Sequence, residues 1–140
     1  HRVLDVDLNA VFYGCRAALP GMVSNNWGRI INLTGMNAIH GYSGRAPVSV
    51  AKHGVWGLTK ALAKEFGPSG ITVNAISPGP IRPEHDDPIQ SQHLHGQVGR
   101  IPLGHLGEPY HIASLCAYLI SDGGGFVSGQ MIACNGAAET

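Results

Sequence analysis

Short apolar runs alternate with longer helical patterns along this chain, and this alternation limits the possible folds more than any other feature. The apolar runs contain few polar residues, which is typical of parallel strands buried on both faces. Runs joined by helices predict an α/β fold, in which crossover helices connect about three parallel strands. The predicted strands cover residues 30–33, 71–76 and 131–134, and the predicted helices cover about 4–23, 46–66 and 108–121.

Proline and glycine positions refine the two longer helices. Pro20-Gly21 is expected to loosen or end the first helix, whereas Pro47 suits the first turn of the second. Gly54 and Gly57 lie inside the second helix, where each glycine costs about 1 kcal/mol relative to alanine. They belong to a face of small side chains, and we expect this face to pack tightly against a second subunit.

Composition and charge exclude several classes of protein. Nine acidic and nine Lys/Arg side chains among 140 residues give a formal net charge of zero, so we expect no nucleic-acid partner. No apolar run reaches the roughly 18 residues that suggest a membrane span, so we expect no membrane partner. The sequence begins without methionine or a signal-peptide pattern, and we expect its beginning to be processed or missing.

Three widely spaced cysteines lie in the predicted helices and strands. Cys15, Cys116 and Cys134 are an odd number and do not have the spacing of a disulfide framework or a zinc site. They are predicted to be small buried hydrophobic residues in a reducing compartment, which favours a cytoplasmic location.

Residues 82–105 are polar, rich in histidine and proline, and weakly periodic. Such a segment is predicted to be a surface loop or a lid. It contains the densest groups of candidate metal ligands, His85-Asp86-Asp87 and His93-Leu94-His95. Because no periodic framework holds them in tetrahedral geometry, solvated loop histidines are favoured and no metal site is expected.

The segment from Gly28 to Ile81 resembles the core of the short-chain dehydrogenase/reductase family, in particular of the 3-oxoacyl-carrier-protein-reductase type. The similarity extends from about Asp7 to Gly136, nearly the whole chain. The family also has an earlier half, with a glycine-rich dinucleotide loop, that is not present here. The resemblance therefore implies that residues 1–140 form a single partial domain, the later half of a Rossmann-type doubly wound parallel sheet.

The family's catalytic set is Asn, Ser, Tyr and Lys, and the resemblance assigns each position in this chain. Asn9 takes the asparagine role and Lys52, in Val50-Ala51-Lys52, matches the lysine. The tyrosine position, four residues before the lysine, is Val48, and the serine position is Gly35. In the family the tyrosine hydroxyl transfers the proton and the serine orients the substrate oxygen. Since losing a general acid costs about 100- to 10,000-fold in rate, the chain is expected to be inactive by this mechanism.

The resemblance also implies a cofactor, which is NAD or NADP. Ser77-Pro78-Gly79-Pro80-Ile81 resembles the family loop that lies over the nicotinamide. The resemblance thus assigns cofactor binding to Pro78, Gly79, Ile81 and Lys52.

A substrate pocket for a small carbonyl compound or alcohol follows from the same resemblance. Its expected lining residues are Gly35, Met36, Tyr42 and Pro80. Tyr42 is the best candidate for a substitute acid or base, although a loop aromatic that packs is the simpler interpretation. Ser49 and His53 are expected to point away from the reactive face.

Three functions remain open at this stage. The chain is an oxidoreductase-family protein acting on a carbonyl or hydroxyl group, a non-catalytic cofactor-binding or regulatory subunit, or a fragment of a longer enzyme. An open sheet edge predicts a partner, which is either the missing N-terminal half or further copies in a homodimer or homotetramer.

Overall fold

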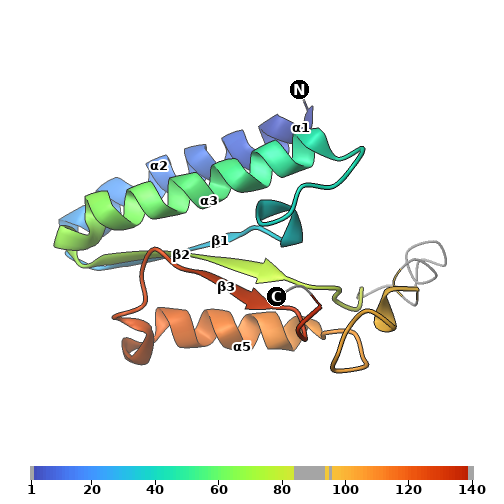
Figure 1. Ribbon diagram of the computed structural model, residues 1–140. Coiled ribbons are helices and arrows are strands. Elements are labelled where there is room, and N and C mark those ends of the chain that lie inside the picture. Colours follow the sequence, from blue (N-terminus) through green and yellow to red (C-terminus); the bar gives the residue numbers. More distant parts are fainter. Residues whose placement is uncertain (1, 84–93, 95, 139–140) are drawn as a thin grey trace.

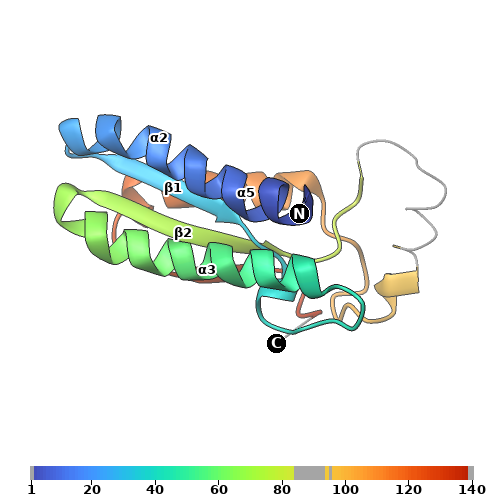
Figure 2. The ribbon, with the colours of Figure 1, turned by 90° about the horizontal axis from the view of Figure 1, so that it is seen from above.

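The computed structural model describes residues 2–83, 94 and 96–138, which form three layers (Figure 1). The helices α2 and α3 lie side by side on one face of a parallel sheet, and α5 lies on the other face (Figures 1 and 2). The strands are β1 (Gly28–Leu33), β2 (Ile71–Pro78) and β3 (Met131–Cys134). The helical elements are α1 (Arg2–Leu4), η1 (Asp5–Asn9), α2 (Ala10–Ser24), η2 (Met36–Ala38), α3 (Ala46–Phe66), η3 (Gly67–Ser69), α5 (Pro109–Ile120) and η4 (Asp122–Gly124).

The sheet has the order β1-β2-β3, and both strand pairs are parallel. This arrangement confirms the predicted α/β fold with three parallel strands and crossover helices. Seven of the eight residues of β2 are buried, as expected for a central strand. Strand β1 differs from the prediction that both its faces are buried, because Leu33 is 51% exposed. Among the described strands β1 has a neighbour on one side only, so it is an edge strand.

The first helical stretch continues past Pro20, contrary to the expectation that Pro20-Gly21 would loosen or end it. Pro20 is exposed and lies inside α2, whose Cys15 and Leu19 are buried in the core. This packing outweighs the proline penalty of about 3 kcal/mol.

The helix instead ends at Ser24, and two residues later Asn26 has a left-handed backbone with φ of 49°. The Trp27 N–H donates to the Met22 carbonyl at 3.2 Å, and the Asn26 N–H donates to the Val23 carbonyl at 3.1 Å. These two bonds form a Schellman motif, in which asparagine takes the place usually held by glycine.

Helix α3 spans Ala46–Phe66, as the apolar periodicity predicted, with a proline in its first turn. Its buried positions form one stripe facing the sheet and the first helical stretch. A Cβ atom at Gly54 would lie 2.9 Å from Cδ1 of Leu8, so close packing within the same chain accounts for this glycine. At Gly57 a Cβ atom would meet nothing within 4 Å. The intramolecular contact therefore corrects the expectation that a second subunit explains Gly54.

The core between α2, α3 and the sheet joins apolar packing to a short polar network. The Asn32 amide donates to the Thr59 hydroxyl at 3.0 Å, and Thr59 donates to the Val55 carbonyl at 2.8 Å. The Cys15 thiol lies 3.8 Å from the Asn32 amide oxygen, and its burial raises the pKa of the thiol. The buried apolar cluster consists of Cys15, Leu19, Ile30, Leu62, Ile71 and Val73.

The three cysteines are free thiols, as predicted. Cys15 is buried, but Cys116 and Cys134 are half-buried, so burial was predicted correctly for one of them. Over the residues that the structure describes, no helix is long and apolar enough to cross a membrane.

Candidate active site

Lys52 lies in α3 with its ammonium group at the carboxyl end of β1. Its Nζ atom donates to the Leu33 carbonyl oxygen at 3.3 Å and lies 3.5 Å from Oδ1 of Asp7. The side chain is 19% exposed, so it is neither buried in the core nor free in solvent. Two neighbouring elements therefore fix the position of this amine.

Asn9 does not take part in this arrangement. Its amide donates to Oδ1 of Asp5 at 2.9 Å, on the exposed side of the π-helical segment η1. Asp7, two residues earlier, faces α3 instead, because residues two apart lie on nearly opposite sides of a helix. The structure thus brings Asp7, and not Asn9, beside Lys52. The charge of Asp7 was the available signal, since a carboxylate on this helix can pair with a lysine of the next.

Val48 lies one helical turn before Lys52 and is half-buried. Its side chain has no group that ionises or forms hydrogen bonds. Ser49 and His53 do not replace one, because the Ser49 hydroxyl is buried without a partner and the exposed His53 ring lies 2.9 Å from the Ser49 carbonyl oxygen.

Gly35 has φ of 142° and ψ of 172°, a backbone conformation that is essentially restricted to glycine. A Cβ atom there would meet nothing within 4 Å, so the restriction comes from the backbone and not from crowding. The loop after β1 is therefore built around glycine at this position.

The loop after β2 is held by the neighbouring backbone. The Gly79 N–H donates to the Cys134 carbonyl at 3.0 Å, and a Cβ atom at Gly79 would lie 2.6 Å from Cα of Asn135. Pro80 accepts a bond from the Gly107 N–H at 2.9 Å, and Ile81 pairs with Gly107 in an isolated parallel bridge. Since Pro78 ends β2, these contacts hold the whole Pro78–Ile81 loop at the carboxyl end of the sheet.

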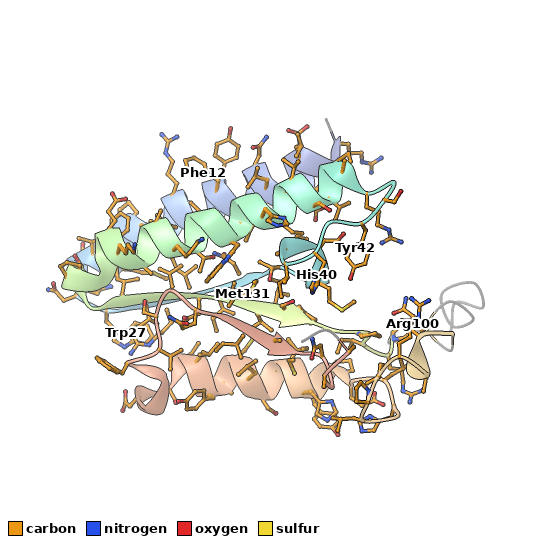
Figure 3. The ribbon with its side chains drawn as sticks, viewed as in Figure 1. Phe12, Trp27, His40, Tyr42, Arg100 and Met131 are labelled. Carbon is orange, nitrogen blue, oxygen red and sulfur yellow. The ribbon has the colours of Figure 1, made fainter. Side chains whose placement is uncertain are left out.

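A cavity of about 250 Å³ lies beside this loop. Three of the four residues expected to line a substrate pocket, Met36, Tyr42 and Pro80, are in its wall, whereas Gly35 is not among its lining residues. Arg45 and Arg100 also line it, and the sequence analysis did not single them out. Arg45 could have been noticed at the start of a predicted helix, but no sequence signal marked Arg100. Figure 3 shows Tyr42 and Arg100 beyond the carboxyl end of the strands.

The candidate metal ligands His85, Asp86, Asp87, His93 and His95 lie outside the described residues, as does much of the predicted lid. Within the described part of the chain, no group of three or more metal-binding side chains occurs. At the described end of the 82–105 segment, the peptide groups of residues 97–104 form consecutive turns.

Comparison with known proteins identifies this arrangement. The family described as enoyl-(acyl carrier protein) reductase matches residues 1–137. The 3-oxoacyl-(acyl-carrier-protein) reductase FabG of Rickettsia felis is 38% identical over 135 residues, which cover 96% of this chain and 56% of that protein. This chain belongs to the short-chain dehydrogenase/reductase family. The acetoacetyl-CoA reductase of Cupriavidus necator is 39% identical over 134 residues, which cover 96% of this chain and 54% of that enzyme.

Solved structures of the short-chain dehydrogenase/reductase family show the same fold. A 3-oxoacyl-(acyl-carrier protein) reductase with bound NAD from Brucella melitensis has a TM-score of 0.85 and 35% identity, covering 96% of this chain and 50% of that chain. A putative oxidoreductase from Escherichia coli has a TM-score of 0.84 and 32% identity, covering 97% and 52%. The chain spans about half the length of the family members it matches.

Proposed function

We propose that this chain is the half of an NAD(P)-dependent oxidoreductase that contains the substrate site. We propose further that this protein does not turn over by the family's Tyr-Lys mechanism. One observation carries the proposal. The Lys52 ammonium is held at the carboxyl end of the sheet, while Val48 takes the position one turn earlier. The carboxyl edge of a doubly wound sheet is where such folds bind their ligands.

The ammonium of Lys52 has capacity for a ligand. An ammonium group has three N–H donors, and the Leu33 carbonyl and the Asp7 carboxylate account for two of them. The third donor is available for a hydroxyl group such as one of a cofactor ribose. Asp7 orients the amine and offsets its charge.

The Pro78–Ile81 loop fits a flat group placed against its backbone. Gly79 packs so closely on Asn135 that any side chain would displace the loop, which keeps the backbone in place. When bound, the nicotinamide supplies the hydride. The role of Pro78, Gly79 and Ile81 is then to position that ring. The residues that distinguish NAD from NADP belong to the family's earlier half, which this sequence does not include.

Proton transfer is the step for which this chain lacks the family's side chains. Val48 and Gly35 hold no acid or base, so a carbonyl oxygen reduced in the cavity would need its proton from another group. Tyr42 is the phenol in the cavity wall and is the substitute donor we would test first.

A non-catalytic role is the second candidate, and the backbone at Gly35 favours it. The chain has valine at the tyrosine position, and the backbone conformation at Gly35 is essentially restricted to glycine. Such a chain is better suited to binding than to proton transfer. In that case it would bind cofactor as a regulatory or structural subunit. Under either function we propose that it acts within a larger assembly, since it spans about half of its relatives.

The helix pair α2–α3 is the surface we propose for contact with a second copy. On α2, Phe12 is 45% exposed and Tyr13 is 61% exposed, and the centroids of their rings lie 5.8 Å apart. Phe12 also lines a groove of about 370 Å³ between the two helices. Exposed aromatic side chains next to a groove are typical of interfaces.

The decisive experiment compares NAD(P)H oxidation and NAD(P)H binding by the natural protein and two variants. We expect the natural protein to bind without measurable oxidation of added ketones, and Val48→Tyr to gain turnover. Val48→Phe is the matched control, because it adds the same ring without the hydroxyl and should stay inactive. Robust turnover by the natural protein that is abolished by Tyr42→Phe would contradict the inactive assignment.

A further inference from the structure

The cavity beside the Pro78–Ile81 loop has a marked charge asymmetry. Among the described residues that line it, two are arginines and none is acidic, in a chain whose formal net charge is zero. Neither Arg45 nor Arg100 makes an ion pair or a side-chain hydrogen bond within the described ranges. The remaining wall residues are Met36, Asn37, Tyr42, Pro80, Gln97, Ile101 and Ala138.

Two other arginines, Arg29 and Arg82, differ from these two. Arg29 donates to the Gly28 and Gly70 carbonyl oxygens and lies over the Trp27 ring. Arg82 pairs with Glu108 at 2.8 Å. Their guanidinium groups are used by the fold, whereas those of the cavity arginines are available to a ligand.

We propose that this cavity binds a short carboxylic acid through Arg45 and Arg100, so that the substrate class is small oxo- or hydroxycarboxylic acids. A guanidinium group has paired N–H donors that match a carboxylate in a planar, two-bond geometry. The part of the proposal that concerns the carbonyl or hydroxyl group rests on the proposed function. The carboxylate site itself rests on the cavity alone.

The backbone fixes where the Arg45 side chain starts. The Arg45 N–H donates to the Tyr42 carbonyl at 3.1 Å, and the Arg45 carbonyl accepts from the Ser49 N–H at 3.0 Å. Arg45 is the N-cap residue of α3, whose first turn contains no acidic side chain. The partial positive charge at the start of this helix adds to the guanidinium charge and favours an anion.

Arg100 is anchored by a buried neighbour. Its N–H donates to the Gln97 carbonyl at 2.9 Å, and the next residue, Ile101, is 5% exposed. Ile101 packs against Gly136, where a Cβ atom would lie 2.7 Å from its Cγ2. Figure 3 places Arg100 and Tyr42 at the same end of the strands. The two arginines thus come from separate, fixed segments and meet around one cavity.

The volume of the cavity limits the size of the acid. About 250 Å³ is below the roughly 300–1,000 Å³ of sites that take drug-sized ligands. A compound of a few carbon atoms fits, whereas a long acyl chain would extend outside. The expected ligand is therefore a small carboxylate, in which the acid group and the reacting oxygen belong to one short molecule.

The test compares two probes of nearly equal shape on the purified protein, acetoacetate and its neutral methyl ester, by calorimetry or NMR titration. We expect acetoacetate to bind tighter by about tenfold or more, as one charge-assisted contact implies. Arg45→Gln and Arg100→Gln should each remove most of this preference, and added salt should weaken it. Arg2→Gln, on the exposed α1 segment, should keep the preference.

Several outcomes would overturn the proposal. These are equal binding of acid and ester, no binding of either, preference unchanged in both arginine variants, or tighter binding of inorganic phosphate than of acetoacetate. If one variant fails to fold by circular dichroism, the other variant and the natural protein's salt dependence still decide. NAD(P)H binding is measured separately. Acid preference without NAD(P)H binding removes the proposed function alone, and the reverse result removes the carboxylate site alone.

Discussion

Lys52 and Asp7 come from different helical segments, and their charged groups lie 3.5 Å apart at the carboxyl end of β1. The same Nζ atom also donates to the Leu33 carbonyl oxygen at 3.3 Å. The pair is partly open, with side chains 19% and 32% exposed. Its role is to aim the ammonium group, since partly exposed ion pairs contribute little to stability.

A double-mutant cycle should detect this pair. We predict a coupling of about 0.2–1 kcal/mol between Asp7→Asn and Lys52→Met in the free energy of unfolding, smaller at high salt. The matched cycle with Asn9→Ala and Lys52→Met should show no coupling, because Asn9 bonds to Asp5. Coupling of Lys52 to Asn9 and not to Asp7 would contradict this prediction. Chemical denaturation of the single and double variants measures both cycles.

The glycine at position 35 should resist replacement. We predict that Gly35→Ser lowers the free energy of unfolding by about 1–3 kcal/mol, because φ of 142° with ψ of 172° is unfavourable for any residue with a Cβ atom. Gly35→Ala should cost a similar amount. Gly41→Ser, in the same loop but without a positive φ, should be nearly neutral. A tolerated Gly35→Ser with a costly Gly41→Ser would contradict the conformational explanation.

The two glycines of α3 should respond differently to alanine. Gly57→Ala is predicted to stabilise the chain by about 0.5–1 kcal/mol, since a Cβ atom meets nothing there and alanine favours the helix. Gly54→Ala should gain less, and Gly54→Val should destabilise, because the new atoms meet Leu8.

Thermal denaturation at several protein concentrations measures these glycine effects. A loss of stability in Gly57→Ala that is present at high protein concentration and shrinks on dilution would indicate that a second copy packs on this glycine. Leu8→Ala should relieve the clash in Gly54→Val, which distinguishes crowding by Leu8 from a general helix effect.

The buried thiol of Cys15 links stability to pH. Burial raises its pKa in the folded chain, opposed in part by the contact with Asn32. Between the ordinary thiol pKa and this raised value the folded chain binds more protons than the unfolded chain, so stability should fall as pH rises through that interval. Below the ordinary value both states are protonated and the contribution is fully present.

Denaturant titrations at neutral and alkaline pH measure this slope. Cys15→Ala should reduce it, because this variant removes the buried thiol. In the folded protein Cys15 should also be the last of the three thiols to react with an aromatic disulfide reagent. Fast labelling of Cys15 under native conditions would show that the α2–α3 contact opens readily.

Local periodicity was sufficient for the secondary structure and the class of fold. The bounds of α3 and β3 matched the apolar patterns, because both elements bury one regular stripe or run. The prediction that Pro20 would loosen or end the helix was wrong, because the local cost of proline in a helix is offset by the tertiary packing of Cys15 and Leu19. The glycines of α3 were likewise ambiguous, since sequence spacing does not say which chain supplies the neighbouring side chain.

By itself, the sequence determined that this chain is an α/β unit with a lysine kept on its central helix and no hydroxyl at position 48. These properties depend on residue identity and near-neighbour spacing. Only the tertiary structure decided that Asp7 accompanies Lys52, and that Arg45 and Arg100 share a cavity. Such contacts join segments 45 or more residues apart, and their geometry is set by how helices pack on a twisted sheet.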